Sequence, residues 1–194
     1  MRKVPREEFF PGACQQFAYE DRAYPIANGQ AISQPYTVAF MCQALKLSPE
    51  DTVLEIGTGS GYSAAVLSKL VRRVISIERI PELAEQAISR LQCFKCDNVQ
   101  IFVGDGTLGC LAQAPYDAIV VTAAAENLPS AYPEQLCEGG RIVIPAGRLN
   151  GVQSMFRYTK LGGEIIPEML GNFSFVPLIG MDGWYLGSTR HRKD

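Results

Sequence analysis

The apolar residues of this chain fall into short blocks that alternate between two patterns. Runs of four to seven residues, rich in Val and Ile and bounded by glycine or acidic residues, are typical of strands buried on both faces. The runs lie at residues 53–56, 74–78, 99–104, 116–122 and 141–145. Between two of them, Leu83, Ala84, Ala87, Ile88 and Leu91 recur at helical spacing. We therefore predict a helix over residues 81–92 with these side chains on its buried face.

The same alternation continues on both sides of this region. Pro35 opens another predicted helix, since proline is favoured at the first helical position. Segments 152–158 and 164–169, joined across Gly162 and Gly163, have the pattern of a hairpin. The order of elements predicts an α/β fold: a doubly wound, mostly parallel Rossmann-like sheet with helices on both faces and a C-terminal hairpin. In such a sheet the ligand lies outside the carboxyl ends of the strands.

Length, charge and hydropathy narrow the class of protein. The 194 residues, 47% of them hydrophobic, suffice for one well-packed domain, which we expect to span residues 1–194. A net charge of −2 provides no basic field for nucleic acid. The sequence contains no apolar run of about 18 residues and no apolar signal-peptide core near its start, so we expect neither membrane insertion nor export. The expectation is a cytoplasmic monomer.

The six cysteines do not predict a metal site or a disulfide framework. Cys93 and Cys96 form one CxxC pair, but a structural zinc site needs two further ligands. The only histidine, His191, lies in a polar tail. The pair also follows an apolar helical stretch and does not open a helix, as a redox pair would. We expect small buried or loop thiols and no bound metal.

A glycine-rich turn at residues 57–61 is the most informative motif. Gly57, Gly59 and Gly61 follow an apolar run that contains Glu55, and Tyr62 stands where the dinucleotide fingerprint G-x-G-x-x-G would place its third glycine. A pyrophosphate site is therefore disfavoured. The pattern acidic-x-Gly-x-Gly-x-Gly resembles motif I of the S-adenosylmethionine-dependent methyltransferases. An ordinary strand-to-helix turn is the alternative.

Polar residues at three further strand ends support a cofactor site. Glu78 ends the second strand, 17 residues after Gly61, where its carboxylate can accept hydrogen bonds from both ribose hydroxyls. Asp105 and Gly106 follow the third strand and offer a carboxylate beside space for an adenine ring. Thr122 ends the fourth strand ahead of small residues that permit close approach. Each acid alone could instead be a helix cap or a solvated turn.

Several longer blocks give a more specific resemblance, covering nearly the whole chain, to the protein-L-isoaspartate O-methyltransferase family. The blocks are Val4–Phe9, Ala18–Asp21, Ile32–Tyr36, Val53–Tyr62, Ile77–Arg79, Val103–Thr107, Ala114–Ile119 and Phe175–Leu178. Members of the family methylate the α-carboxylate of L-isoaspartyl residues in damaged proteins. The resemblance therefore implies S-adenosylmethionine as cofactor, S-adenosylhomocysteine as product and damaged proteins or peptides as partners.

The resemblance also implies roles for residues and segments of this chain. Ser33 matches the active-site hydroxyl, and Val176 and Pro177 would lie against the substrate. The expected cofactor-binding residues are Gln30, Ala31, Ile32, Gly57, Thr58, Gly59, Gly61, Glu78, Asp105, Gly106 and Thr122. Residues 1–34 would form the N-terminal segment and active-site cover, residues 35–147 the cofactor-binding core, and residues 148–194 the hairpin, substrate-side loop and tail.

The chemistry of a carboxylate substrate agrees with this sequence independently. Methylation of a hydroxyl or a protonated amine requires a positioned base, and the commonest one, histidine, occurs only in the tail. A carboxylate with a pKa of about 3.5 is already ionised at neutral pH. The protein then has only to desolvate and align it, and Ser33 would orient it by a hydrogen bond. The alternative for Ser33 is a cap of the helix that Pro35 opens.

Three departures from the family pattern leave other functions open. Ala31 stands where threonine is usual, Ser174 where many bacterial members have arginine, and the sequence starts almost directly at the Val-Pro-Arg-Glu block. The start could therefore be truncated. One alternative function is methylation of a small carboxylate metabolite by the same fold. Another is a non-catalytic module that binds S-adenosylmethionine.

Overall fold

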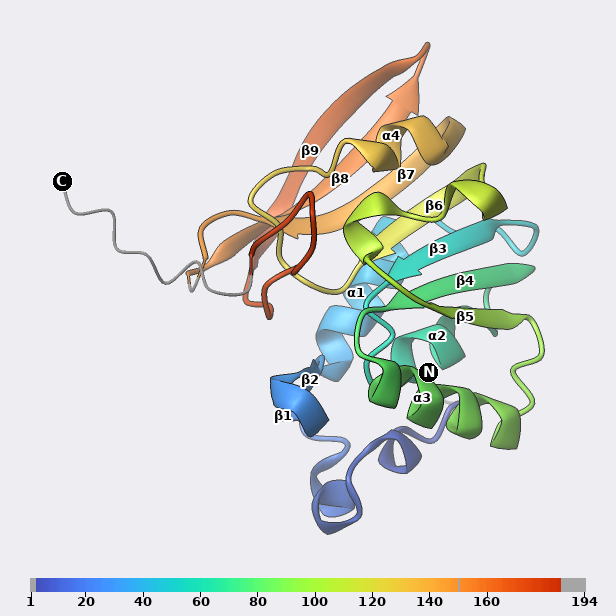
Figure 1. Cartoon of the computed structure of the whole chain (residues 1–194), viewed down its shortest axis with the longest axis vertical. Helices are drawn as coiled ribbons and strands as arrows, with labels where there is room; N and C mark the ends of the chain where they lie inside the picture. The colour runs from blue at the N-terminus through green and yellow to red at the C-terminus, as the bar shows by residue number, and fades with distance from the viewer. Residues whose placement is uncertain (1–2, 150, 186–194) are drawn as a thin grey trace, which may run out of the picture.

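A seven-stranded sheet forms the centre of the computed structural model, which describes residues 3–149 and 151–185 (Figure 1). The strand order is β5-β4-β3-β6-β7-β8-β9. The strands are β3 Thr52–Ile56, β4 Arg73–Glu78, β5 Val99–Val103, β6 Tyr116–Val121, β7 Leu136–Ala146, β8 Gln153–Leu161 and β9 Glu164–Phe173. Strands β3 to β7 pair in parallel, whereas β8 and β9 are antiparallel to their neighbours. The predicted fold class is confirmed, and the strand order reverses between β3 and β6.

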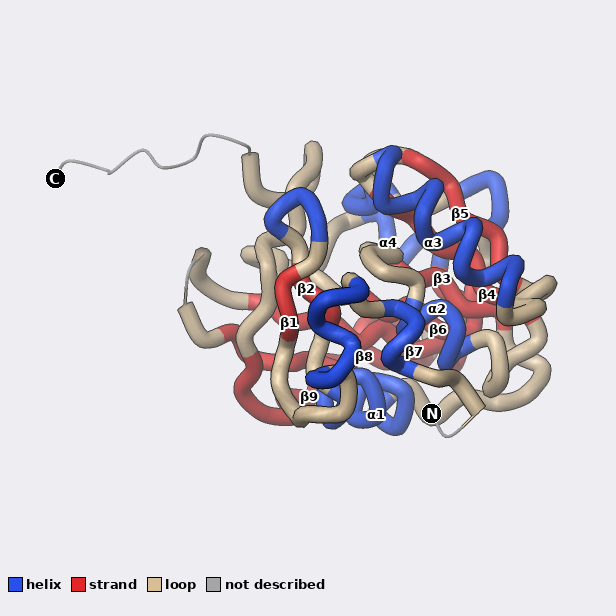
Figure 2. Tube along the Cα trace, turned by 90° about the horizontal axis from the view of Figure 1, so that it is seen from below, coloured by secondary structure: helices blue, strands red, loops and turns tan. Residues whose placement is uncertain are grey.

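Four helices pack on the sheet, namely α1 Pro35–Ala44, α2 Tyr62–Leu67, α3 Pro81–Cys93 and α4 Ala131–Gln135. Helices α1 and α4 lie on opposite sides of the sheet (Figure 2). The predicted alternation of strand and helix fails between β5 and β6, where two short 3-10 turns, Gly106–Leu108 and Leu111–Gln113, make the connection. This segment contains Gly104, Gly106 and Gly109, and glycine is a poor helix former.

Both faces of the central strands are buried, which explains their near-continuous apolar sequences. On one face, residues such as Leu54, Ile119 and Ile142 pack with Tyr132 of α4. On the other, residues such as Val53 and Val120 pack against α1 and α2. One predicted core position on α3 is wrong: Ile88 is 37% exposed. The other four members of its predicted stripe are buried.

The N-terminal segment folds back over α2 and α3. It contains three 3-10 turns, η1 Arg6–Phe9, η2 Gly12–Phe17 and η3 Ala27–Gly29, and a two-stranded ribbon of β1 Tyr24–Pro25 and β2 Ala31–Ile32. The ring of Phe9 packs edge-on against Tyr62 and stacks on Phe94, at centroid distances of 5.5 and 5.4 Å. Burial of these aromatic side chains fixes an otherwise irregular segment beside the carboxyl ends of the strands.

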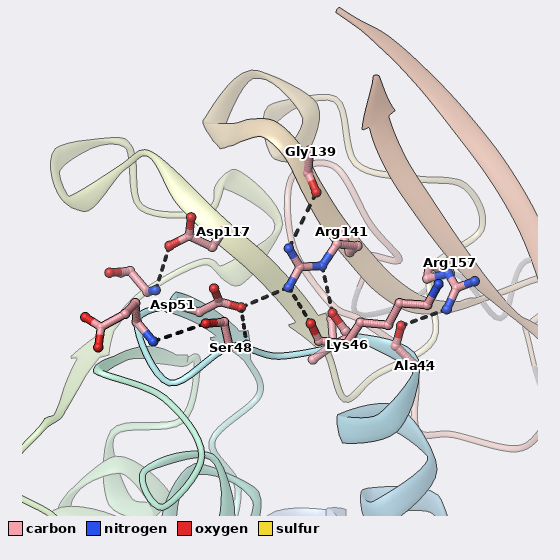
Figure 3. Close-up of polar contacts among 11 residues, drawn as sticks. Ala44, Lys46, Ser48, Asp51, Asp117, Gly139, Arg141 and Arg157 are labelled. Atoms are coloured by element: carbon pink, nitrogen blue, oxygen red, sulfur yellow. Dashed lines mark hydrogen bonds and ion pairs between the residues drawn. The ribbon is translucent and has the colours of Figure 1, made fainter. Parts of the chain in front are cut away.

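Two arginines from the sheet hold the C-terminal end of α1 (Figure 3). Arg141 donates to the carbonyl oxygens of Leu45 and Lys46, at 2.7 and 3.0 Å, and pairs with Asp51 at 2.9 Å. Arg157 donates to the carbonyl oxygen of Ala44 at 3.1 Å. Because the last carbonyls of a helix lack partners within it, these cations stabilise that end. Helix α1 is therefore anchored to β7 and β8 at the end remote from Ser33.

The C-terminal hairpin matches the sequence prediction. Strands β8 and β9 are joined across Gly162 and Gly163, whose φ angles of 62° and 82° suit a type I′ turn. Glycine is needed here because other residues rarely adopt positive φ at two successive positions. Within the described part of the chain, none of the helices has both the length and the apolar character needed to cross a membrane.

Candidate active site

A pocket lies at the carboxyl ends of β3, β4 and β6, where the strand order reverses. This is where doubly wound sheets bind ligands. Twelve of the predicted site residues line it: Gln30, Ala31, Ile32, Ser33, Gly57, Thr58, Gly59, Glu78, Gly106, Thr122, Val176 and Pro177. The N-terminal segment, the glycine turn, the strand ends and the loop after β9 therefore meet around one cavity. Gly61 and Asp105 are not among its lining residues.

The glycine turn is shaped by close contact with Thr122. Gly57 has a φ of 93°, and a Cβ added to it would lie 2.4 Å from the hydroxyl oxygen of Thr122. That hydroxyl lies 2.7 Å from the carbonyl oxygen of Gly57 and 3.0 Å from that of Ile56, so it donates its hydrogen bond to the turn. Thr122 thus lines the pocket and also holds the first glycine in place.

Two of the predicted cofactor glycines have packing reasons to be glycine. Gly61 has a φ of 88°, and an added Cβ would lie 3.2 Å from the Cβ of Ala87, so it allows α2 and α3 to approach each other. At Gly106 an added Cβ would lie 2.5 Å from the side chain of Ile56. A side chain at Gly106 would therefore collide with Ile56, which is a packing reason for glycine here. Gly106 also lines the pocket, and its place beside an adenine ring stays a prediction.

Glu78 presents an ordered carboxylate at the end of β4. One oxygen accepts a hydrogen bond from the amide of Gly59 at 2.8 Å, and the other accepts from the amide of Ile80 at 2.9 Å. Each carboxylate oxygen has a further lone pair for a second donor. The residue is 6% exposed, so the carboxylate faces the pocket from a fixed position. This geometry suits two vicinal hydroxyls such as those of ribose.

A buried polar network lies directly beneath the glycine turn. Glu55 has no exposed surface, and its Oε2 accepts a hydrogen bond from the Ser76 hydroxyl at 2.6 Å. The Ser76 hydroxyl is also 2.6 Å from that of Thr58, while Oε1 of Glu55 is left without a hydrogen-bond partner among the described residues. Burial raises the pKa of Glu55 to about 7, although the Ser76 hydroxyl favours the ionised form. Glu55, the acidic residue of the glycine motif, therefore supports the turn through Ser76 and Thr58.

The raised pKa of Glu55 predicts a pH-dependent contribution to stability. A carboxyl group whose pKa rises from 4.5 to about 7 on folding contributes full stability below pH 4.5 and loses it as the pH rises through 7. Above pH 7 the cost is on the order of 3 kcal/mol. Glu55→Gln should therefore gain stability relative to wild type between pH 5 and pH 8. Urea unfolding of both proteins without cofactor measures this, and a difference that is the same at both pH values would contradict it.

Asp105 binds the loop after β9. Its Oδ1 accepts hydrogen bonds from the amide and the hydroxyl of Thr107, at 2.9 and 2.6 Å, and its Oδ2 accepts from the amide of Met181 at 2.7 Å. Burial would raise the pKa of Asp105, but these donors outweigh it and hold the pKa below the usual value. The carboxylate therefore ties the end of β5 to the loop, a role that the sequence did not suggest.

Ser33 is half-buried and lines both the pocket and an adjoining groove. The groove is lined by Ala23, Ala31, Ser33, Gln34, Thr37, Thr122, Gly151, Val152, Ser174, Phe175, Val176 and Pro177. Its hydroxyl makes no hydrogen bond within the part of the chain that the structure describes. Gln34, and not Ser33, is the residue that precedes α1 as its N-cap, and the amide of Tyr36 is bound by Asp21 Oδ1 at 2.8 Å. The alternative that Ser33 caps α1 is therefore wrong, because Pro35 has no amide hydrogen and Asp21 binds the next one.

The Val176–Leu178 segment is fixed against the end of β6. The amide of Ala124 donates to the carbonyl oxygen of Val176 at 2.8 Å, and the amide of Leu178 donates to the carbonyl oxygen of Ala124 at 2.7 Å. The indole of Trp184 donates to the same carbonyl of Ala124 at 3.1 Å. These bonds place Val176 and Pro177 at the boundary of the pocket and the groove.

Comparison with known proteins identifies the family. The model of the family described as protein-L-isoaspartate(D-aspartate) O-methyltransferase matches residues 1–183. The chain belongs to this family. It is 52% identical over 185 residues to protein-L-isoaspartate O-methyltransferase 2 of Pelobacter propionicus, covering 95% of this chain and 82% of that protein. It is 47% identical to protein-L-isoaspartate O-methyltransferase of Methanoculleus marisnigri, covering 95% and 83%.

Solved structures agree with this assignment. A protein-L-isoaspartate O-methyltransferase with 30% identity superposes with a TM-score of 0.83, covering 93% of this chain and 60% of that chain. A putative protein-L-isoaspartate O-methyltransferase from Plasmodium falciparum, in complex with S-adenosyl-L-homocysteine, is 27% identical with a TM-score of 0.76, covering 92% of this chain and 87% of that chain. The family and the fold predicted from the sequence are both confirmed.

Several pocket residues escaped the sequence prediction. Arg79 and Ile80 follow Glu78 directly, and Leu178 and Ile179 follow the predicted Val176 and Pro177. Their adjacency to predicted residues could have revealed them, because consecutive residues that leave a strand end share one edge of the sheet. Ser60, Tyr62 and Ser63 also line the pocket although the sequence suggested no role for them beyond the turn.

The CxxC pair has no site geometry. Cys93 is exposed and Cys96 is buried, and both are free thiols. The described residues include no group of three or more side chains that could hold a metal ion, and His191 lies outside them. Replacing both cysteines by serine should therefore leave methyl transfer within about twofold and metal content at background. Stoichiometric zinc in the purified wild-type protein would refute this expectation.

Proposed function

We propose that this chain transfers a methyl group from S-adenosylmethionine to the α-carboxylate of L-isoaspartyl residues in damaged proteins and peptides. The observation that carries the proposal is the junction of two cavities. The pocket at the strand ends and the adjoining groove share Ala31, Ser33, Thr122, Val176 and Pro177. A cofactor in the first and a peptide in the second would meet at these residues.

The residues of the pocket fit S-adenosylmethionine. The Glu78 carboxylate suits a ribose. Gly57 leaves open a space in the turn that the Cβ of any other residue would fill. Apolar side chains such as Ile77 and Ile80 offer surfaces for an adenine ring. The β2 segment, from Gln30 to Ile32, would cover the ligand. When bound, this cofactor supplies an electrophilic methyl group on a sulfonium. This fit supports Glu78 and the glycine turn as the principal cofactor-binding elements.

The adjoining groove suits a peptide chain. It is lined by Ala23, Ala31, Ser33, Gln34, Thr37, Thr122, Gly151, Val152, Ser174, Phe175, Val176 and Pro177. All of these side chains are uncharged and many are small, which suits main-chain groups and varied flanking side chains. The groove also includes residues such as Ala23 and Val152, which do not line the pocket. The lining therefore favours a peptide substrate over a small metabolite.

The chain's own residues would act by orientation and desolvation. The hydroxyl of Ser33, which has no partner in the described part of the chain, is available to donate a hydrogen bond to the substrate carboxylate, which is already ionised and needs no base. The Val176–Pro177 backbone, fixed on Ala124, would hold the adjacent main chain. In the methyl ester product, attack by the neighbouring peptide nitrogen expels methanol and closes a succinimide, whose hydrolysis returns part of the material to normal aspartate.

The proposal extends to the parts of the chain and to its setting. Residues 1–34 would cover the active site, residues 35–147 would hold the cofactor, and residues 148–194 would supply the hairpin and the substrate-side loop. All six cysteines are free thiols, which suits the reducing conditions of the cytoplasm. We place the enzyme there as a monomer that acts on isoaspartyl-containing chains, and sedimentation at micromolar concentration tests the oligomeric state.

Identification of the product tests the proposed function. An isoaspartyl peptide incubated with the enzyme and S-adenosylmethionine should first gain one methyl group and then lose methanol to form a succinimide, which mass spectrometry resolves. The same peptide with its α-carboxyl group converted to an amide should remain unmodified. A stable methyl group at another position would refute the proposal, and binding of cofactor without any methylated product would indicate the non-catalytic module.

A further inference from the structure

Arg6 is a fully buried arginine in the N-terminal segment, with 1% of its surface exposed. Its guanidinium lies over the rings of Tyr62 and Phe10, at 4.7 and 5.1 Å from their centroids. It forms no ion pair within the described residues, and its Nη1 has no hydrogen-bond partner. Burial lowers the pKa of Arg6, against the opposing influence of Tyr62 and Asp21. Arg6 is thus a desolvated cation beside a wall of the pocket, since Tyr62 lines it.

Packing alone does not account for a guanidinium at this position. Removing a cation from water is costly, and an apolar side chain of similar volume is often at least as stabilising. Two hydrogen bonds from the side chain of Arg6 to backbone carbonyls show what the guanidinium provides. Nε donates to the carbonyl oxygen of Ala18 at 2.7 Å, and Nη2 donates to the carbonyl oxygen of Ser33 at 2.7 Å. One planar group thereby joins two segments of the cover that are 15 residues apart in sequence.

The contact with Ser33 fixes the backbone at the junction of the pocket and the groove. Pro35 has no amide hydrogen and therefore cannot donate a hydrogen bond from the backbone next to Ser33. The amide of Tyr36 donates to Asp21. The carbonyl of Ser33 is bound by Arg6, so its peptide plane is held from the side of the N-terminal segment. Ser33 is a lining residue of both cavities. The direction of its hydroxyl therefore depends on a backbone that Arg6 and Asp21 hold on either side of Pro35.

We propose that Arg6 is a positioning residue that sets the Ser33 hydroxyl for the substrate carboxylate through the Ser33 carbonyl. The inference rests on the proposed function of Ser33, because Arg6 reaches the substrate only through that residue. Its effect should fall on isoaspartyl turnover and much less on cofactor affinity, since among the described residues its side-chain hydrogen bonds reach Ala18 and Ser33 and not Glu78 or the glycine turn. Loss of Arg6 should matter only while the Ser33 hydroxyl is present.

A double-mutant cycle tests this dependence directly. Arg6→Met, Ser33→Ala and the double variant are compared with wild type for kcat and KM on an isoaspartyl peptide, and for S-adenosylhomocysteine affinity by calorimetry. Arg6→Met should lower kcat/KM by roughly 10-fold in the wild-type background and by less than about twofold in the Ser33→Ala background. Cofactor affinity should stay within about threefold in all variants.

Arg157→Met is the matched control, because Arg157 also donates to a carbonyl of the α1 region but at its remote end. It should lower kcat/KM by the same small factor, within about twofold, in both backgrounds. If Arg6→Met fails to fold, the cycle uses Arg6→Lys, which keeps the charge but whose single nitrogen is poorly placed to bind both carbonyls.

The outcomes separate the two claims. An Arg6 effect of equal size with and without the Ser33 hydroxyl overturns the positioning role, while a strong Ser33→Ala effect in the same cycle leaves the proposed function intact. A Ser33→Ala variant with unchanged kcat/KM removes Ser33 from the active site, and the role of Arg6 fails with it. Loss of cofactor affinity in Arg6→Met would show a structural role in the pocket and would also overturn the proposal.

Discussion

Glu78→Ala is expected to weaken S-adenosylhomocysteine binding by roughly 30- to 1000-fold. The substitution would remove two charge-assisted hydrogen bonds to ribose, worth on the order of 2–4 kcal/mol together. The structure strengthens this expectation because the amides of Gly59 and Ile80 already hold the carboxylate in place. Little side-chain entropy remains to be lost when a ligand binds. Titration calorimetry of the purified variant gives the affinity.

Glu82→Ala provides the control for this measurement. Glu82 lies in the exposed first turn of α3, four residues after Glu78, so its loss changes net charge equally without reaching the pocket. Its affinity should match wild type within about twofold. Circular dichroism establishes that each variant is folded. Unchanged affinity in folded Glu78→Ala would mean that the ribose lies elsewhere.

Ser33→Ala is expected to lower kcat/KM for an isoaspartyl peptide by roughly 10- to 100-fold. One charge-assisted hydrogen bond to the carboxylate would be lost, and a less restrained nucleophile aligns less often with the methyl group. Affinity for S-adenosylhomocysteine should barely change. Because the Ser33 hydroxyl has no partner among the described residues and does not cap α1, the melting temperature should also stay near that of wild type.

Melting temperature and methyl transfer measured on the same Ser33→Ala preparation decide between the roles. A stable variant with reduced turnover keeps Ser33 in the active site. A stable variant with full turnover removes it, and the substrate carboxylate must then be oriented by other groups of the groove. A destabilised variant with full turnover would contradict both the proposed role and the observed absence of a capping hydrogen bond.

The sequence was most informative where local pattern and chemistry coincide. The apolar run that contains Glu55 and the alternate glycines gave the strand, the turn and the cofactor class together. Glu78 could be located because a strand end at a fixed distance from the turn must lie on the same edge of the sheet. The Gly162-Gly163 pair predicted the hairpin because few residues other than glycine accept two positive φ angles.

The sequence was least informative where a residue acts through a contact distant along the chain. Arg6 resembles any charged residue of a polar N-terminal segment, and only the folded structure brings it to Ser33, 27 residues later. In the sequence, Asp105 has the position of a ligand-binding acid at a strand end, yet its carboxylate oxygens accept hydrogen bonds from the amides of Thr107 and Met181. The sequence also did not show that a side chain at Gly106 would collide with Ile56. Such assignments depend on packing partners that periodicity does not encode.

The connection between β5 and β6 shows the same limit for secondary structure. Regular alternation predicted a helix beside each strand. The connection between β5 and β6, residues 104–115, instead contains two 3-10 turns. Their role is to bring Asp105 and Thr107 against the loop after β9, where the hydroxyl of Thr107 also accepts a hydrogen bond from the backbone amide of Asp182 at 3.1 Å. The glycines of this segment disfavour a helix, and the contacts with that loop hold the turns in place.

Transfer of labelled methyl from S-adenosylmethionine to matched substrates tests the central claim most directly. Two peptides of identical sequence, one with L-isoaspartate and one with L-aspartate, are assayed beside a small dicarboxylic acid at equal concentration. We predict rapid labelling of the isoaspartyl peptide, with kcat/KM at least about 100-fold above that for the other two substrates. Equal labelling of both peptides, or labelling of the small acid alone, would contradict the account.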